Sequence, residues 1–195
     1  GGDTVDATIL FTDLRDYTTL SEKVTPQQLV SMLNEYFNLV NRLVEKNGGF
    51  VNKFIGDAVM AIYGLDTLEG SCDAAYATAL QVQAELVGLN ESFRKRGLPT
   101  IENGIGIHHG PVVAGVIGAE ERVEFTVIGD TVNTAARLES LTKSLSSFAA
   151  VSKPVFDRIP AERRGGLSPV GEHQLKGKAE KTLVYGLLET RVAHA

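Results

Sequence analysis

Two aspartates in this sequence are placed where they could bind divalent metal ions together. Asp13 ends the strand-like run from 7 to 14 (ATILFTDL), and Asp57 follows Gly56 between two further strand-like runs. Carboxylate oxygens are hard ligands, and Mg²⁺ or Mn²⁺ held by one or two carboxylates is usually shared with substrate phosphates. Either aspartate alone is explained better by the needs of a turn. For the pair, a metal site and a turn role are about equally good interpretations.

A second group of polar residues falls on a predicted helix. Asn133 and Arg137 are four residues apart, so they share one helix face and could contact the same ligand. Arg137 would present a planar fork to a phosphoryl oxygen, and Asn133 could bond to a sugar hydroxyl. A solvated helix surface has the same pattern, and it is the better explanation of these two residues taken alone.

Basic residues occur at two further places of interest. Lys53 stands in an otherwise apolar strand-like run. It could lie along the sheet with its ammonium at the rim, pair with Asp57, or donate to a base or phosphate in a cleft. The turn formed by Lys176, Gly177 and Lys178 is by default a solvated basic surface.

Several familiar catalytic motifs are missing from the sequence. It contains no Walker A loop, dinucleotide-binding fingerprint, nucleophile elbow or His-Glu-x-x-His zinc motif. His108 and His109 end a predicted strand without further ligand candidates nearby, so we expect them to be structural. Cys72 is the only cysteine, which excludes an internal disulfide and a thiolate cluster and fits a reducing compartment.

The hydrophobic periodicity predicts the elements that must position these side chains. Helices are predicted from Thr25 (N-cap, with Pro26 and Gln28 completing a capping box) to 47–49, from 71 to about 96, and from 130 to about 142. Strands are predicted at 7–14, 50–55, 58–63, 104–109, 112–117, 123–128, near 149 and at 183–188. Strand, helix, hairpin, helix, strand is the split βαβ order, an α+β fold whose antiparallel-rich sheet carries helices on one face. The first strand and the hairpin are neighbours in that fold, which brings Asp13 and Asp57 to one edge.

Composition limits the class of protein. The chain has 195 residues, 43% hydrophobic and 22% charged, with a net charge of −5. These values predict one soluble globular domain over 1–195, with a core at about 5–190. No run approaches the roughly 18 apolar residues of a membrane span, and the first residues have no signal-peptide pattern. The acidic balance argues against general binding to nucleic acid, so a bound polyanion would need a local pocket or metal ions.

Five segments together resemble the catalytic domain of class III nucleotidyl cyclases. They are FTDLRDYT (11–18), NKFIGDAVMAIYG (52–64), GIHHGPVVAG (106–115), FTVIGDTVNTAARLE (125–139) and LKGK (175–178). Their common order and spacing are far more specific than any one motif, and they cover nearly the whole chain. The resemblance implies a ferredoxin-like α+β fold that forms a head-to-tail homodimer with active sites between the subunits. It also implies an adenylyl cyclase that converts ATP to 3′,5′-cyclic AMP and pyrophosphate in signal transduction.

The resemblance assigns roles to individual residues. Asp13 and Asp57 would bind two Mg²⁺ (or Mn²⁺) ions per active site, with help from the backbone of Leu14. The following turn would hold the phosphates through Arg15, Tyr17 and Thr18. The other subunit would supply Lys53 and Thr126 for the purine, Asn133 for the ribose, Arg137 for the α-phosphate transition state, and Lys176 for the terminal phosphates.

Two positions bear on the choice of nucleotide. ATP-using members of the family carry lysine at the position of Lys53, where guanylyl cyclases usually carry glutamate. Many ATP-using members carry aspartate at the position of Thr126, and threonine occurs there in the bicarbonate-responsive branch. A hydroxyl can both accept and donate, so discrimination against GTP could be looser. A response to bicarbonate is a hypothesis that rests on Thr126 alone.

The phosphate-binding turn departs from the family pattern. Asp16 replaces the usual glycine, and Tyr17 replaces phenylalanine. The carboxylate of Asp16 could change the turn, repel a triphosphate or join the metal shell. We expect activity because the metal, ribose and transition-state positions are all filled.

Other functions remain as alternatives to an adenylyl cyclase. One is a catalytically inactive nucleotide-sensing regulatory module, although such domains lose metal aspartates or the Asn/Arg pair; another is a guanylyl cyclase. A diguanylate cyclase is excluded because Gly1-Gly2-Asp3 precedes the first strand instead of forming a hairpin. Catalytic domains of this family are commonly fused to sensor or membrane modules. We therefore expect an output domain excised from a larger multidomain protein, cytoplasmic or tethered through missing segments, with no direct membrane contact of its own.

Overall fold

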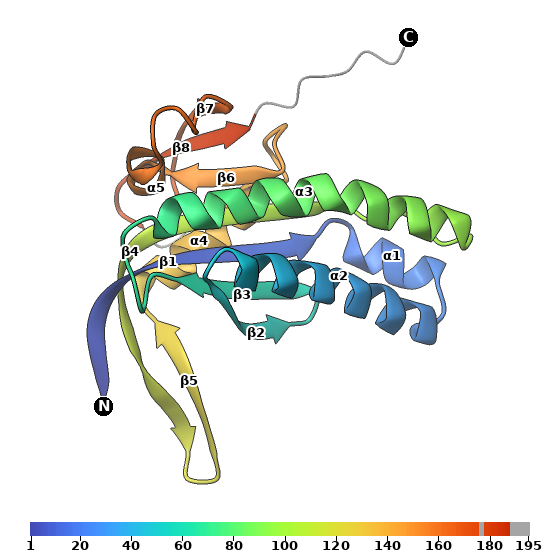
Figure 1. The fold of residues 1–195 in the computed structure, drawn as a ribbon, viewed down its shortest axis with the longest axis horizontal. Coiled ribbons are helices and arrows are strands. Elements are labelled where there is room, and N and C mark those ends of the chain that lie inside the picture. Colours follow the sequence, from blue (N-terminus) through green and yellow to red (C-terminus); the bar gives the residue numbers. More distant parts are fainter. Residues whose placement is uncertain (176–177, 188–195) are drawn as a thin grey trace.

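The computed structural model describes residues 1–175 and 178–187, which form one mixed α+β structure (Figure 1). Within these residues an eight-stranded sheet has the order β2-β3-β1-β4-β6-β8-β7, with β5 paired to β4. All pairings are antiparallel except that of β4 with β6. The strands are β1 (Gly2–Leu14), β2 (Phe50–Ile55), β3 (Ala58–Tyr63), β4 (Asn103–Ala119), β5 (Arg122–Ile128), β6 (Ala149–Ser152), β7 (Leu167–His173) and β8 (Thr182–Leu187). The helices are α1 (Tyr17–Lys23), α2 (Pro26–Lys46), α3 (Ser71–Lys95), α4 (Asp130–Leu141) and α5 (Lys153–Arg158).

The predicted split βαβ core is confirmed. The segment from β1 to β4 contains α2 and α3 as its two long helices, and its strands are ordered β2-β3-β1-β4, which is the ferredoxin-like order. Helix α2 begins as its sequence predicts, because the Thr25 hydroxyl accepts from the backbone of Gln28 while the Gln28 side chain accepts from the backbone of Thr25. Helix α2 and the β2–β3 hairpin therefore fold as their local signals indicate, whereas β1 begins at Gly2, earlier than predicted.

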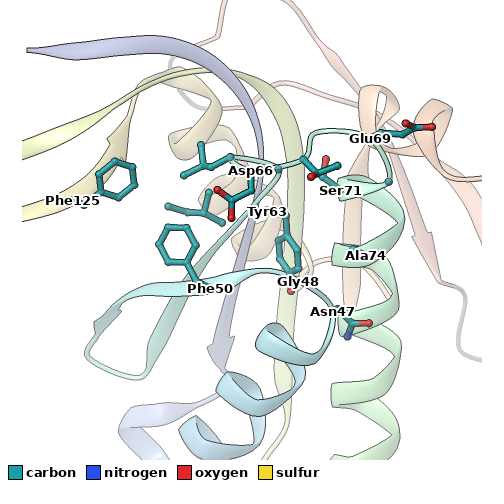
Figure 2. A pocket seen from close by; sticks show the side chains of 14 residues that line it. Asn47, Gly48, Phe50, Tyr63, Asp66, Glu69, Ser71, Ala74 and Phe125 are labelled. Carbon is teal, nitrogen blue, oxygen red and sulfur yellow. The ribbon is translucent and has the colours of Figure 1, made fainter.

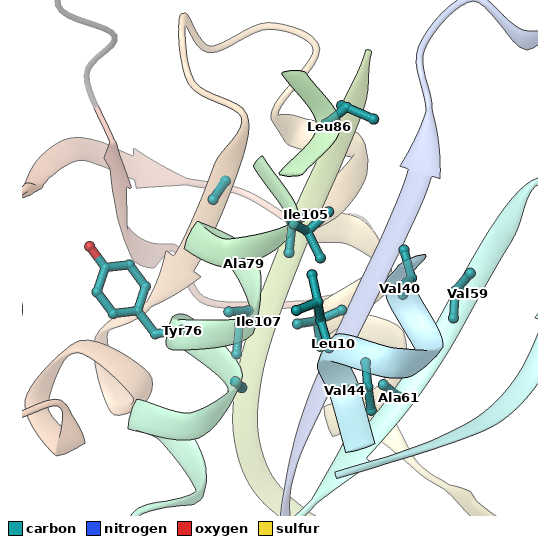
Figure 3. Packing of buried hydrophobic residues seen from close by; sticks show 14 of the residues in the cluster. Leu10, Val40, Val44, Val59, Ala61, Tyr76, Ala79, Leu86, Ile105 and Ile107 are labelled. Carbon is teal, nitrogen blue, oxygen red and sulfur yellow. The ribbon is translucent and has the colours of Figure 1, made fainter. Parts of the chain in front are cut away.

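Helices α2 and α3 lie side by side across one face of the sheet, where they bury the larger apolar core (Figures 1 and 3). Alternate residues of the two central strands point into it, because successive strand residues face opposite sides of a sheet. The contributors include Leu10 of β1, Ile105 and Ile107 of β4, and Val40 and Val44 of α2, all buried. This core fixes β1, whose last residues carry the candidate metal ligands.

Helix α4 packs on the opposite face, which the sequence analysis did not predict. Gly104 and Gly106 alternate with the core isoleucines of β4 and face α4. A Cβ added at Gly106 would meet the backbone of Ala135 and Glu139, so the helix lies directly on the strand. The predicted placement of helices on one face of the sheet holds for α2 and α3. Helix α4 lies on the opposite face, where the glycines of β4 leave room for it.

The predicted strands 104–109 and 112–117 are one continuous strand, β4. Pro111, which lies between the two predicted strands, cannot donate a hydrogen bond to a strand ladder. Pro111 pairs with Asp6 of β1, while β6 and β5 pair with β4 only before and after this point. The other side of β4 is thus unpaired at Pro111, and the strand continues. The last part of β4 pairs with β5, and the two strands form a long hairpin that projects from the rest of the protein (Figure 1).

Short elements complete the fold. Helices α1 and α5 and strand β7 were not predicted, and α1 begins within the segment expected to be a phosphate-binding turn. Within the residues described, no helix is long and apolar enough to cross a membrane.

Candidate active site

The carboxylates of Asp13 and Asp57 meet at one edge of the sheet, as the sequence predicts. Asp13 lies near the end of β1, and β1 pairs with β3 up to Thr12 and Val59, so the β2–β3 turn lies beside it. Gly56 opens this turn with a φ of 62°, which glycine adopts without a Cβ penalty. Asp57 accepts a hydrogen bond from the backbone N–H of Leu14 at 3.2 Å, which brings its carboxylate to the residue that follows Asp13.

The electrostatics of this pair favour a cation. Burial, followed by the hydrogen bond and charge of Asp57, raises the pKa of Asp13 to about 7. One oxygen of Asp13, Oδ1, is buried without a hydrogen-bond partner. Mg²⁺ and Mn²⁺ bind to carboxylate oxygens. An oxygen of Asp13 that receives no hydrogen bond, next to a second carboxylate, is therefore a suitable ligand for such an ion. The two residues therefore fit a divalent cation, although the described part of the chain contains no cluster of three or more such side chains.

A cleft of about 530 Å³ opens beside the two carboxylates. Its lining comes from the end of β1, the start of α1, the β2–β3 turn and the segment after α4, and comprises Asp13, Leu14, Arg15, Asp16, Tyr17, Thr18, Thr19, Asp57 and Lys143. Asp16 precedes α1 with a φ of 52°, the left-handed conformation. Asparagine and aspartate tolerate this conformation better than most residues, and glycine adopts it at least cost. The departure at Asp16 thus keeps the turn and adds a negative charge to the cleft.

Arg15 lines the cleft but its guanidinium holds neighbouring backbone. Nη2 donates to the carbonyl of Ser147 at 3.0 Å and to that of Thr142 at 3.4 Å, and the Arg15 N–H donates to the carbonyl of Glu102. Arg15 therefore fastens the end of β1 to the segment that follows α4. A phosphate-binding role for Arg15, Tyr17 and Thr18 stays a prediction.

Lys53 and Thr126 lie in a second group, formed by β2 and β5. The Lys53 ammonium is 2.9 Å from a carboxylate oxygen of Glu124. Thr126 donates to Oδ1 of Asn52 at 2.8 Å, and the Asn52 amide donates to the carbonyl of Phe125. These contacts join β2 to β5, and a role of Lys53 and Thr126 in purine binding stays a prediction. Neither lines the cleft beside Asp13.

Helix α4 presents Asn133 and Arg137. Asn133 is exposed and Arg137 is half-buried. The Arg137 Nη1 atom is buried, has no hydrogen-bond partner among the residues that the structure describes, and lies 3.8 Å from Oδ1 of Asp130. Lys178 approaches the other oxygen of Asp130 at 3.1 Å. An arginine whose fork lacks hydrogen bonds is suited to an incoming anion. Lys176, predicted for the terminal phosphates, lies outside the described residues.

Two charged residues near the cleft, Glu139 and Lys143, were not predicted from the sequence. Glu139 is 6% exposed; burial raises its pKa to about 7, while Lys143 and Arg15 act in the opposite direction. The spacing of Glu139 from Ala135, four residues earlier on the buried face of α4, could have identified it as an inward-facing acid. Lys143 follows α4, and nothing in the local pattern distinguishes it from a surface lysine.

Another cavity, of about 540 Å³, lies at the far end of β2 and β3 (Figure 2). Phe50, Tyr63 and Phe125 surround it, with Asp66 between them (Figure 2). It contains none of the residues to which the sequence assigns chemistry. The carboxylate cleft is therefore the better candidate for catalysis.

Known proteins that are similar to this chain identify its family. The model of the adenylate and guanylate cyclase catalytic domain matches residues 3–189. An adenylate cyclase of Anabaena cylindrica is 37% identical over 91% of this chain, and adenylate cyclase 1 of Rhizobium meliloti is 34% identical over 92%. The chain spans 36% and 27% of the lengths of these two relatives.

Solved structures show the same fold. The adenylyl cyclase CyaB from P. aeruginosa has a TM-score of 0.87 at 27% identity, and a guanylyl cyclase has a TM-score of 0.85 at 30% identity. Each comparison covers 98% of both chains. The chain belongs to the family of adenylate and guanylate cyclase catalytic domains.

Proposed function

We propose that this domain is an adenylyl cyclase, which converts ATP to 3′,5′-cyclic AMP and pyrophosphate. The observation that carries the proposal is the pair of Asp13 and Asp57 in an open cleft, with one carboxylate oxygen lacking a donor. Asn133 and Arg137 are present on α4 in the same chain. A nucleotide-sensing module without catalysis would not need this complete set.

The reaction is an in-line attack of the ribose 3′-hydroxyl on the α-phosphate. Two divalent cations held by Asp13 and Asp57 would neutralise the triphosphate and lower the pKa of the attacking hydroxyl. Asn133 positions the ribose through its amide. Arg137 supplies a planar fork to the oxygens of the α-phosphate, where negative charge develops in the transition state. No carboxylate or imidazole of the protein needs to remove the proton.

Lys53 and Thr126 support ATP as the substrate. The Lys53 ammonium can donate to N1 of adenine, and the Thr126 hydroxyl can accept from the 6-amino group. In this structure the two side chains contact Glu124 and Asn52 respectively, so the purine would replace or share these partners. Because the relatives include both adenylyl and guanylyl cyclases, the ratio of the two activities has to be measured.

We also propose a symmetric homodimer with shared active sites. Lys53, Thr126, Asn133 and Arg137 do not line the cleft that contains the aspartate pair. A second copy related by twofold symmetry would supply them to each cleft. The projecting β4–β5 hairpin exposes apolar side chains, including Val116, Val123 and Phe125, as expected for a surface that another subunit covers.

Complementation tests the shared site. Asp57→Ala and Arg137→Ala would each be inactive as a homodimer. In a mixed dimer, one of the two sites keeps both native residues, so each mixed dimer should have about half of the wild-type activity. Random pairing in an equimolar mixture makes about half of the dimers mixed, so about a quarter of the wild-type activity should return overall. A mixture of Asp57→Ala with the double variant provides the matched control, since every site lacks a residue. No recovery in a confirmed mixed dimer would argue against sites shared in this way.

Activity of the domain could be regulated by other parts of a longer protein or by a small molecule. Because the relatives are longer than this chain, we propose that the domain is the cytoplasmic output of a larger signalling protein with sensor domains. A bicarbonate response remains a hypothesis based on Thr126. Unchanged turnover on adding bicarbonate at constant pH would remove it.

A further inference from the structure

Arg15 anchors the segment that follows α4 beside the metal cleft. Its Nη2 atom donates to the carbonyls of Thr142 and Ser147, so one guanidinium holds both ends of a short loop. The Thr142 hydroxyl also donates to the carbonyl of Glu139, and the Ser147 hydroxyl accepts from the N–H of Leu187 at 3.0 Å. The loop between 142 and 147 therefore has a fixed position relative to the end of β1.

Lys143 lies in this anchored loop and lines the cleft with Asp13 and Asp57. Three aspartates and two cationic residues line the cleft in all, and Arg15 already donates to two carbonyls. Within the described residues, the Lys143 ammonium has neither an ion-pair nor a hydrogen-bond partner, although the Lys143 backbone N–H donates to the carbonyl of Ser140.

We propose that Lys143 binds the terminal phosphates of the nucleotide from the same protomer that carries the aspartate pair. A lysine ammonium is a compact charge with three donors and is well suited to phosphate oxygens. A triphosphate held at Asp13 and Asp57 would meet a negatively charged cleft, and Lys143 is the lining cation free to offset that charge. This role rests on the proposed nucleotide cyclase function and adds a substrate contact that the motifs did not assign.

The test compares Lys143→Met, which keeps the length of the side chain without its charge, with Lys143→Arg. Lys95→Met on the exposed surface of α3 is the control, because Lys95 makes only a surface pair with Glu91. We expect Lys143→Met to raise the KM for ATP and the inhibition constant of pyrophosphate by about tenfold. Inhibition by adenosine, which has no phosphate, should not change. Lys143→Arg should recover most of the lost affinity, and Lys95→Met should behave as the wild type.

Calorimetric titration with Mg²⁺ and pyrophosphate gives a readout that needs no turnover. Weaker pyrophosphate binding by Lys143→Met, with unchanged binding by Lys95→Met, supports the proposal. Equal binding by all variants overturns it, as does an equal loss of adenosine and pyrophosphate inhibition, which would indicate a general structural effect. If the wild type makes no cyclic nucleotide, the proposed function fails, while the titration still decides whether Lys143 binds phosphates.

Discussion

Replacing Asp13 by asparagine should stabilise the metal-free protein. Burial and the neighbouring Asp57 raise the pKa of Asp13 from 3.8 to about 7, so the folded state disfavours the ionised form. Such a difference would correspond to roughly 4 kcal/mol if it were fully expressed. Asp13 is partly exposed, and screening by solvent reduces the expected gain for Asp13→Asn to about 1–2 kcal/mol at pH 8.

The stability gained by Asp13→Asn should increase with pH. Well below pH 3.8 the carboxyl is protonated in both the folded and unfolded states, and no penalty exists. As the pH rises from 4 to 7, the unfolded state ionises while the folded state resists, so the wild type loses stability relative to Asp13→Asn. Above pH 7 the difference stays constant. The gain should therefore be less than half as large at pH 5 as at pH 8.

Urea denaturation in the presence of a chelator measures the effect. The free energy of unfolding is compared for the wild type, Asp13→Asn and the exposed control Asp66→Asn at pH 5 and pH 8. The control should change by no more than about 0.5 kcal/mol. Addition of Mg²⁺ should stabilise the wild type more than Asp13→Asn, because a ligand stabilises the state that binds it. A gain that is absent at pH 8, or equal at both pH values, would refute the electrostatic explanation.

Three further substitutions test separate parts of the site. Gly106→Ala should lower the free energy of unfolding by about 2–3 kcal/mol and reduce kcat, because the added methyl group displaces α4. Unchanged stability in urea denaturation would contradict the direct packing of α4 on β4. Asp16→Gly should raise the free energy of unfolding by about 0.5 kcal/mol, because glycine adopts a φ of 52° without strain. It should also lower the KM for ATP, because it removes a carboxylate from the cleft. An increased KM would show that Asp16 assists binding. Lys53→Glu should lower the ratio of ATP to GTP turnover at least about tenfold, measured from both cyclic products, and an unchanged ratio would remove Lys53 from purine recognition.

Local signals account for the parts of the fold that the sequence predicts. The capping box at Thr25 and the glycine of the β2–β3 turn are determined by neighbouring residues, so α2 and the hairpin could be predicted almost to the residue. Helix α1, helix α5 and strand β7 are short, and β7 contains Pro169 and Gly171. Periodicity is weak over so few residues, and pairing with β8 is what makes β7 a strand.

Part of the candidate site could likewise be predicted from the sequence, and part of it could not. Asp13 and Asp57 could be placed together because strand order alone brings a strand end beside a hairpin turn. The contacts of Arg15 with Thr142 and Ser147 join residues more than a hundred positions apart, and no local pattern encodes them. Lys143 enters the cleft only because those contacts hold its loop. Long-range hydrogen bonds therefore set the part of the site that the sequence could not reveal.

The most direct test of the central claim is the product formed from each nucleotide. The purified domain is incubated with ATP or GTP and with Mg²⁺ or Mn²⁺ over a range of protein concentrations, and the products are separated by chromatography. An adenylyl cyclase with shared sites predicts cyclic AMP from ATP and a specific activity that rises with protein concentration as dimers form. Cyclic GMP as the main product, or no cyclic nucleotide from a folded and dimeric protein with either metal, would contradict the claim.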